Sequence, residues 1–137
     1  MGKDTLYTIG YGGRSPAQVA ALLTEHKISV LVDVRASPLS RIPAYNKNTL
    51  SHYLDGWSIT YHHIQALGNA NRNAGADAPI HLEDEALGLE ELRHVLETWP
   101  RPADHPYVAI MCAERDHRGC HRTYIAERLP ECTVVHL

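Results

Sequence analysis

The chain has 137 residues and a formal charge of −3 with its histidines counted as neutral. This length suits one domain, covering residues 1–137, that buries roughly two-thirds of its unfolded surface in a single core. The acidic total excludes a molecule that is basic overall, so binding of nucleic acid would require a local basic cleft.

No stretch approaches eighteen consecutive apolar residues, and the first residues lack the apolar core of a signal peptide. The chain has three cysteines, and an odd number suits a reducing compartment better than a disulfide scaffold. We therefore expect a cytoplasmic protein that does not enter a membrane.

The first third of the chain alternates strand and helix patterns. Residues 5–9 form a short apolar run rich in β-forming residues, which predicts a strand. Ser15 followed by Pro16 is typical of a helix start, and apolar residues recur at helical spacing up to His26. Residues 28–34 are almost all apolar, which favours a parallel strand covered on both faces.

The middle of the chain has weaker patterns. Residues 36–46 contain prolines and serines and are typical of a loop, after which Asn46 or Asn48 begins a short helix. Residues 59–63 predict a third strand. Residues 65–82 are rich in glycine and asparagine and have no period, and a loop this long is usually functional or mobile.

Regular patterns return in the last third. Helical spacing covers residues 83–98, a strand is predicted over 107–111, a helix over 119–129 and a last strand over 132–137. The order of elements implies an α/β fold with three α/β/α layers. We expect a Rossmann-like, mostly parallel sheet of about five strands with right-handed crossovers.

Three blocks of sequence resemble a known family. They are Thr8-Ile9-Gly10, then Leu31-Val32-Asp33-Val34-Arg35 with Ser37-Pro38, Ser40-Arg41 and Tyr45-Asn46, and finally Cys112-Ala113-Glu114 with Cys120-His121-Arg122. In this order they resemble the domain-of-unknown-function family 488 (DUF488) over nearly the whole chain. The resemblance implies a compact α/β domain of bacteria and archaea, and it favours a link to base removal in DNA repair.

Two acidic residues are the leading catalytic candidates. Asp33 ends a predicted strand and Glu114 follows another, so both are expected at the carboxyl edge of the sheet, where α/β proteins bind ligands. Two carboxylates can share acid and base work in the hydrolysis of an N-glycosidic bond, with His63, His117 or His121 as proton donor. We therefore predict a hydrolase that removes a base from nucleic acid or a nucleotide. The alternative for Asp33 is a structural salt bridge to a nearby arginine.

The substrate is expected to carry phosphate, because several arginines fall in predicted carboxyl-edge loops and guanidinium groups bind phosphate oxygens in pairs. Tyr11 and Tyr45 offer rings on which a base can stack. The predicted substrate-binding residues are Tyr11, Arg14, Arg35, Ser37, Arg41, Tyr45 and Arg122. Arg72, Arg93, Arg101 and Arg118 are interpreted as solvated surface residues.

Cysteine chemistry is the rival enzyme hypothesis. Cys112 to Arg118 has the spacing C-x5-R between a strand and a helix, as in cysteine phosphatases and rhodanese-like sulfurtransferases. Cys112 would then be the nucleophile. Against this hypothesis, Glu114 and Asp116 lie inside the supposed anion-binding loop and would repel phosphate.

A small metal-binding or regulatory module without catalysis is the third hypothesis. Cys112, Cys120 and His121, with His117 nearby, could bind zinc or iron. The seven-residue gap between the cysteines does not match common zinc motifs, so we assign no metal and no cofactor. Cys132 is expected in the core.

Overall fold

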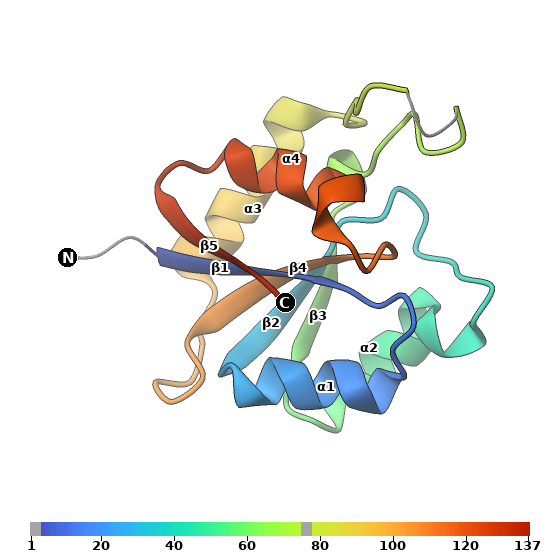
Figure 1. Ribbon diagram of the computed structural model, residues 1–137. Helices are drawn as coiled ribbons and strands as arrows, with labels where there is room; N and C mark the ends of the chain where they lie inside the picture. Colours follow the sequence, from blue (N-terminus) through green and yellow to red (C-terminus); the bar gives the residue numbers. More distant parts are fainter. Residues whose placement is uncertain (1–3, 75–77) are drawn as a thin grey trace.

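The computed structural model describes residues 4–74 and 78–137, which form an α/β fold (Figure 1). The strands are β1 (Asp4–Gly10), β2 (Ile28–Asp33), β3 (Thr60–His63), β4 (Tyr107–Cys112) and β5 (Cys132–His136), and the helices are α1 (Pro16–Glu25), α2 (Lys47–Asp55), α3 (Glu85–Thr98) and α4 (His121–Glu127). The strand order is β3-β2-β4-β1-β5, and all four pairings are parallel. The expected fold class is confirmed.

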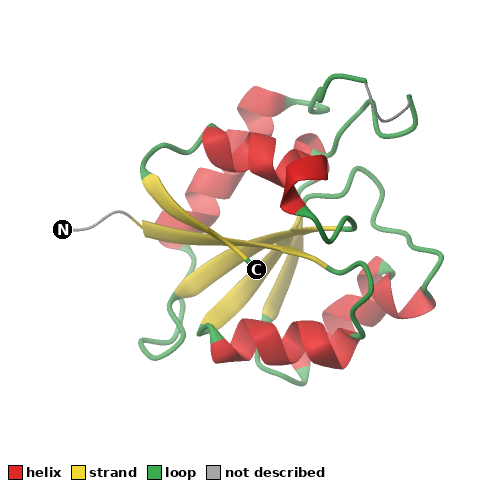
Figure 2. Ribbon diagram, viewed as in Figure 1, coloured by secondary structure: helices red, strands yellow, loops and turns green. Residues whose placement is uncertain are grey.

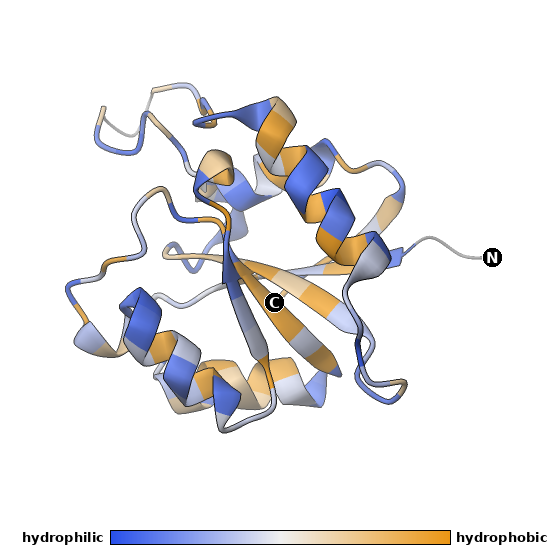
Figure 3. Cartoon of the chain, turned by 180° about the vertical axis from the view of Figure 1, so that it is seen from behind, coloured by the Kyte–Doolittle hydropathy of each residue, from blue (hydrophilic) through white to orange (hydrophobic). Residues whose placement is uncertain are grey.

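Helices cover both faces of the sheet. Figure 1 shows α1 and α2 below the strands and α3 and α4 above them. Because strand side chains alternate between faces, neighbouring residues of β2 enter different layers. Val30 and Val32 pack with Leu92 of α3 on one side, whereas Leu31 packs with Leu23 of α1 on the other. Figure 3 shows the corresponding concentration of hydrophobic residues along the strands. In the described part of the chain, no helix has the length and apolar character needed to cross a membrane.

Most helix and strand bounds differ from the expected ones by one or two residues. The predicted start of α1 is confirmed, since Ser15 Oγ accepts from the Gln18 amide at 3.1 Å and Gln18 Oε1 accepts from the Ser15 amide at 2.8 Å. The last helix begins later than expected, at His121, because residues 117–119 form a separate 3-10 turn. This turn begins at Asp116, whose side chain accepts from the Arg118 amide.

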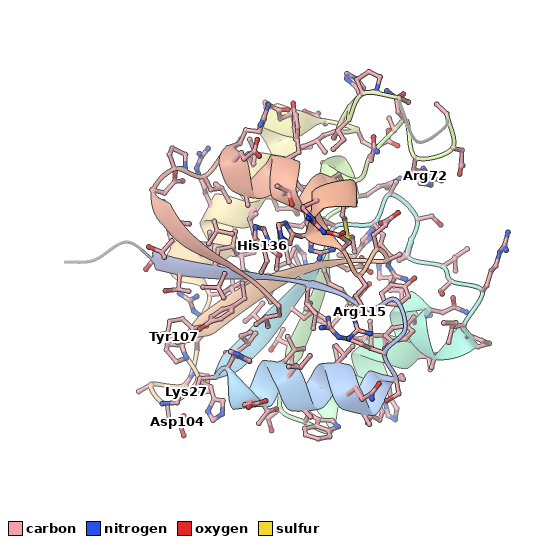
Figure 4. The ribbon with its side chains drawn as sticks, viewed as in Figure 1. Lys27, Arg72, Asp104, Tyr107, Arg115 and His136 are labelled. Atoms are coloured by element: carbon pink, nitrogen blue, oxygen red, sulfur yellow. A yellow bond between two sulfur atoms is a disulfide. The ribbon has the colours of Figure 1, made fainter. Side chains whose placement is uncertain are left out.

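The carboxyl ends of the strands meet at one edge of the sheet. In Figure 4, Arg115 and Arg72 lie toward this edge, whereas Lys27, Asp104 and Tyr107 lie at the opposite one. Figure 2 shows that long loops follow the strands on the carboxyl side. The fold therefore gathers these loops into one region, as parallel α/β sheets generally do.

Gly10 fixes the approach of two of these loops. A Cβ atom at Gly10 would lie 1.7 Å from the carbonyl oxygen of Glu114. The strands cannot easily separate here, because the Tyr11 amide donates to the Cys112 carbonyl at 3.2 Å and the Gly12 amide donates to the Ala113 carbonyl at 2.8 Å. The segment after β4 is thus held tightly against the end of β1.

Gly10→Ala should lower the free energy of unfolding by about 2 kcal/mol or more, because the added methyl group meets rigid backbone. Gly56→Ala is the matched control. Gly56 is exposed, ends α2 with a right-handed conformation and leaves 3.4 Å to the nearest atom, so this change should alter stability by less than about 1 kcal/mol. Urea unfolding of both variants measures the difference, and equal effects would contradict the close approach at Gly10.

Candidate functional site

A cavity of about 830 Å³ opens among the loops at the carboxyl edge. Its walls come from the segments after β1, β2 and β4, from the start of α4 and from residues 69–73 and 78–80. The predicted site residues that line it are Tyr11, Arg35, Ser37, Cys112, Glu114 and His121. Histidine aside, the charged residues described in its walls are Arg35, Arg72, Arg118 and Glu114. The cavity walls thus contain three guanidinium groups, of which Arg35 is paired with Asp33 and Arg118 with Asp116.

Asp33 and Arg35 form a buried ion pair behind the cavity wall. Arg35 Nε lies 2.9 and 3.0 Å from the two Asp33 carboxylate oxygens, and Nη2 lies 2.7 Å from Oδ2. The Arg35 amide also donates to Oδ1, and the Tyr61 hydroxyl donates to Oδ2. Asp33 is completely buried and is not among the lining residues. Its carboxylate therefore positions Arg35, which is the salt-bridge alternative considered from the sequence.

Arg35 is held with part of its guanidinium directed away from Asp33. Its Nη1 lies 3.4 Å from the Tyr11 hydroxyl, and its carbonyl oxygen lies 2.7 Å from His63 Nε2. Burial alone lowers the pKa of Arg35, but the hydrogen bonds and negative charge of Asp33 outweigh burial and raise the pKa overall. Arg35 is therefore a permanent, positioned cation in the cavity wall.

Tyr45 supports the wall from behind. Its ring is fully buried and stacks on Tyr11, with 4.0 Å between ring centroids, and its hydroxyl donates to the Arg14 carbonyl at 2.6 Å. Burial raises the pKa of Tyr45 to about 12. Tyr11 reaches the cavity, and its hydroxyl donates to Ser40 Oγ at 3.2 Å. One face of the Tyr11 ring is therefore already occupied by Tyr45.

The other arginines predicted to bind substrate lie elsewhere. Arg14 Nη1 donates to the Gly10 carbonyl at 2.9 Å, and burial together with the nearby charge of Arg115 lowers its pKa. Arg41 is exposed on the loop before α2. Arg122 is completely buried and points inward. None of these three predicted residues lines the cavity.

Cys112 and Cys120 form a disulfide, and both are buried. The odd number of cysteines had predicted reduced thiols, and for Cys112 and Cys120 this prediction was wrong. Cys112 lines the cavity, whereas Cys120 precedes α4. Cys132 is buried in the core cluster beneath α3 and α4, as expected.

The possible metal ligands Cys112, Cys120 and His121 come close together, with one ligand atom of each within 4.8 Å of the others. In the disulfide the two sulfurs are bonded to each other and supply no thiolate, the form that binds metals. His121 Nε2 lies 2.6 Å from the Val34 carbonyl oxygen, which leaves Nδ1 as its possible ligand atom. While the disulfide is formed, one histidine nitrogen is the only ligand of this group and the arrangement does not fit a metal ion.

Several groups of the C-x5-R segment are already engaged within the protein. The Arg118 amide and side chain both donate to Asp116, at 2.9–3.0 Å. The carbonyls of Glu114 and Arg115 point inward and accept from Arg122. An anion-binding loop needs free N–H groups directed at the ligand. The Arg118 amide is not free, so these contacts count against an anion-binding role for the segment.

In the predicted loop of residues 65–82, of which 75–77 lie outside the described residues, the described parts supply one wall of the cavity. An antiparallel bridge between Asn69 and Leu82 closes the loop, and Asn69 Oδ1 accepts from the amides of Asn71 and His81. Its lining residues are Asn69, Asn71, Arg72, Asn73, Ala78 and Ile80. Sequence analysis marked the loop as functional or mobile by its length but proposed no site residue in it. The concentration of asparagine residues in this stretch was the sequence feature that could have indicated a binding role.

His121 makes stability depend on pH. Burial lowers its pKa from the ordinary value near 6.5, and Arg122 acts in the same direction, whereas the Val34 carbonyl, Glu114 and Asp33 partly oppose the shift. Because the unfolded chain binds the proton more readily, the stability that neutral His121 contributes is present above pH 6.5 and is lost as the pH falls. His121→Gln should therefore reduce the loss of stability between pH 7.5 and pH 5.

Urea unfolding at several pH values measures this effect. The control is His52→Gln, because His52 is exposed on α2. The control should retain the pH dependence of the original chain. A His121→Gln variant with the same pH dependence as the control would show that His121 does not resist protonation in the folded state.

Together, the fold and site define an α/β protein with a ligand-sized cavity at the carboxyl edge of a parallel sheet. The family described as Domain of unknown function DUF488 matches residues 15–129. The chain belongs to this family, as its sequence blocks suggested. The searches returned no match among curated proteins and none among solved structures.

Proposed function

We propose that the cavity binds a phosphate-bearing, nucleotide-like ligand and that Glu114 takes part in hydrolysis of its N-glycosidic bond. The observation that carries this proposal is that Arg35 and Glu114 line the same cavity. Its volume of about 830 Å³ lies in the range of small-molecule sites. An anion receptor would bind the phosphate of the substrate, and a carboxylate would act at the sugar.

Arg35 is the proposed phosphate-binding residue. Asp33 occupies its Nε and Nη2, and this leaves N–H donors of the guanidinium for a ligand in the cavity. A guanidinium held by buried hydrogen bonds loses little side-chain entropy when a ligand binds. Arg72 also lines the cavity, as does Arg118, which is paired with Asp116.

The asparagine residues of the cavity wall, Asn69, Asn71 and Asn73, are suited to bind the base. Asn69 uses its carbonyl oxygen within the loop, and Asn71 uses its amide nitrogen to donate to the Pro79 carbonyl at 2.8 Å. The opposite ends of these two side chains supply one amide donor group and one carbonyl acceptor. Such groups match the edges of nucleobases.

Glu114 is the proposed catalytic carboxylate. A carboxylate beside the sugar can orient the attacking water and stabilise the positive charge that develops as the bond to the base breaks. Asp33 is engaged by Arg35 and Tyr61 and has no part in this mechanism beyond positioning Arg35. Arg35 would offset negative charge on phosphate or on the departing base.

The alternative of a Cys112-dependent phosphatase or sulfurtransferase has less support. The Cys112 sulfur is bonded to Cys120, and the amide of Arg118 is occupied by Asp116. The proposed hydrolysis is tested by incubating the protein with free nucleosides, nucleotides and oligonucleotides that contain damaged bases, and by measuring released base by chromatography. We expect release from at least one phosphate-bearing substrate. No release from the whole panel would contradict the proposal.

A further inference from the structure

The disulfide between Cys112 and Cys120 lies in the cavity region but has no role in the hydrolysis proposed above. Its two sulfurs have different surroundings. Cys112 contacts the guanidinium of Arg122, whereas Cys120 contacts the imidazole of His121. These surroundings indicate what each sulfur does when the bond is reduced.

Arg122 is a fully buried cation whose hydrogen-bond acceptors are all uncharged. Its Nε lies 3.2 Å from Thr8 Oγ1, Nη1 lies 3.0 Å from Cys112 Sγ, and the carbonyls of Glu114 and Arg115 accept its other bonds. Within residues 4–74 and 78–137, no carboxylate forms an ion pair with it. Buried charges are normally paired, because an isolated buried charge is very costly.

Cys112 can provide the missing negative charge. Thiols ionise near pH 8.5 in water and at lower pH beside a cation. Of the four groups that Arg122 contacts, the Cys112 sulfur is the one that becomes an anion at moderate pH when reduced. Reduction of the disulfide would therefore convert an unpaired buried guanidinium into half of an ion pair.

Cys120 has a hydrogen-bond acceptor instead. Because His121 Nε2 lies 2.6 Å from the Val34 carbonyl, this nitrogen carries the ring proton, and Nδ1 keeps its lone pair. Nδ1 lies 3.7 Å from Cys120 Sγ. Burial lowers the pKa of the ring and so favours its neutral form. In the reduced protein, His121 Nδ1 is thus placed to accept a hydrogen bond from the Cys120 thiol.

We propose that Cys112 and Cys120 form a redox-active pair that reduces a small anionic disulfide bound in the cavity. Cys112 is the attacking thiolate, because it lines the cavity and contacts Arg122. Cys120 is the resolving cysteine, because it is absent from the lining and contacts His121. The guanidinium groups of Arg35, Arg72 and Arg118 line the cavity and are the groups that would bind an anionic substrate.

The reaction balances in two exchange steps. The Cys112 thiolate attacks one sulfur of the substrate disulfide, forming a mixed disulfide and releasing one thiolate. Cys120 then attacks the Cys112 sulfur and its proton passes to the departing sulfur, forming the Cys112–Cys120 bond and releasing the second half of the substrate as a thiol. The substrate disulfide is reduced by two electrons, and the protein dithiol is oxidised by two. A second dithiol must restore the reduced protein.

The first test follows the stoichiometry with the unmodified chain. The protein is reduced with dithiothreitol, freed of reductant and mixed with one equivalent of oxidised glutathione, the anionic probe. We expect release of two glutathione molecules per protein and formation of the Cys112–Cys120 bond, identified by peptide mass spectrometry. Oxidised glutathione should react at least about tenfold faster than cystamine, a cationic disulfide. Release of fewer than two molecules, or faster reaction with cystamine, would overturn the proposal.

The second test assigns the two sulfurs. In a Cys132→Ala background, Cys120→Ser leaves Cys112 and Cys112→Ser leaves Cys120, and circular dichroism verifies that each variant is folded. The pH dependence of thiolate absorbance should give a pKa for the Cys112 thiol at least about one unit below the ordinary thiol pKa near 8.5. It should also form a mixed disulfide with oxidised glutathione at least about tenfold faster than Cys120. An ordinary or raised pKa for the Cys112 thiol, or faster reaction at Cys120, would refute the roles of Cys112 as the attacking and Cys120 as the resolving cysteine.

Discussion

Arg35→Met is expected to lower the free energy of unfolding by about 3–5 kcal/mol, because it leaves the Asp33 carboxylate buried without its cation. Asp33 is completely buried, and Arg35 supplies three side-chain contacts to it between 2.7 and 3.0 Å. Methionine replaces much of the volume of the arginine stem but none of these hydrogen bonds. Urea unfolding monitored by circular dichroism measures the loss.

A double variant separates the ion pair from packing. Asp33→Asn combined with Arg35→Met should be more stable than the sum of the two single effects predicts, because the double variant contains no unpaired charge. Arg41→Met is the matched control, since Arg41 is exposed, and it should change stability by less than about 0.5 kcal/mol. Additive effects of the two substitutions would show that Asp33 and Arg35 do not stabilise each other.

Glu114→Gln should reduce the rate of base release by about 10²- to 10⁴-fold, the usual contribution of a general acid or base. Glutamine keeps the shape of the side chain but cannot accept a proton from water or stabilise a positive sugar. Because Glu114 is exposed, its replacement should leave the melting temperature nearly unchanged. Single-turnover assays with saturating protein measure the chemical step directly.

The control for this substitution is Glu25→Gln, an exposed position at the end of α1, remote from the cavity. It changes the net charge of the protein by the same amount and should retain full activity. If Glu114→Gln retained the activity of this control on a substrate that the original chain cleaves, Glu114 would not be the catalytic carboxylate.

The fold was predictable because its local signals agree. The apolar run at 28–34 can be buried on both faces only in the interior of a sheet, and β2 lies there, between β3 and β4. Ser15 and Pro16 mark a helix start through their own backbone and side-chain chemistry, which does not depend on distant residues. These features depend only on short stretches of sequence.

The candidate site was predictable only in part. The carboxyl-edge rule correctly located the region that contains Arg35 and Glu114, because parallel strands bring their ends together. It could not show that Asp33 turns inward to hold Arg35, since charged residues after a strand can face either solvent or one another. The contribution of Asn69 to the wall depends on its bridge to Leu82, a contact distant in sequence.

The direction of the Arg122 side chain also could not be predicted from the sequence. Next to Cys120 and His121 at a helix start, an arginine is equally suited to phosphate binding and to burial. Its direction is set by the carbonyls of Glu114 and Arg115, which the close packing at Gly10 turns toward the interior. No local pattern encodes this arrangement.

Arg35 is proposed to make the cavity a receptor for phosphate-bearing ligands, and calorimetric titration measures this binding. The ligands are deoxynucleoside monophosphates and the matching nucleosides, and the proteins are the original chain, Arg35→Lys and the control Arg41→Lys. Lysine retains a cation for Asp33 but loses the planar fork of arginine. We expect monophosphates to bind more tightly than nucleosides, and Arg35→Lys alone to weaken their binding at least about tenfold. Equal affinity in Arg35→Lys, or no binding to the original chain, would contradict this proposal.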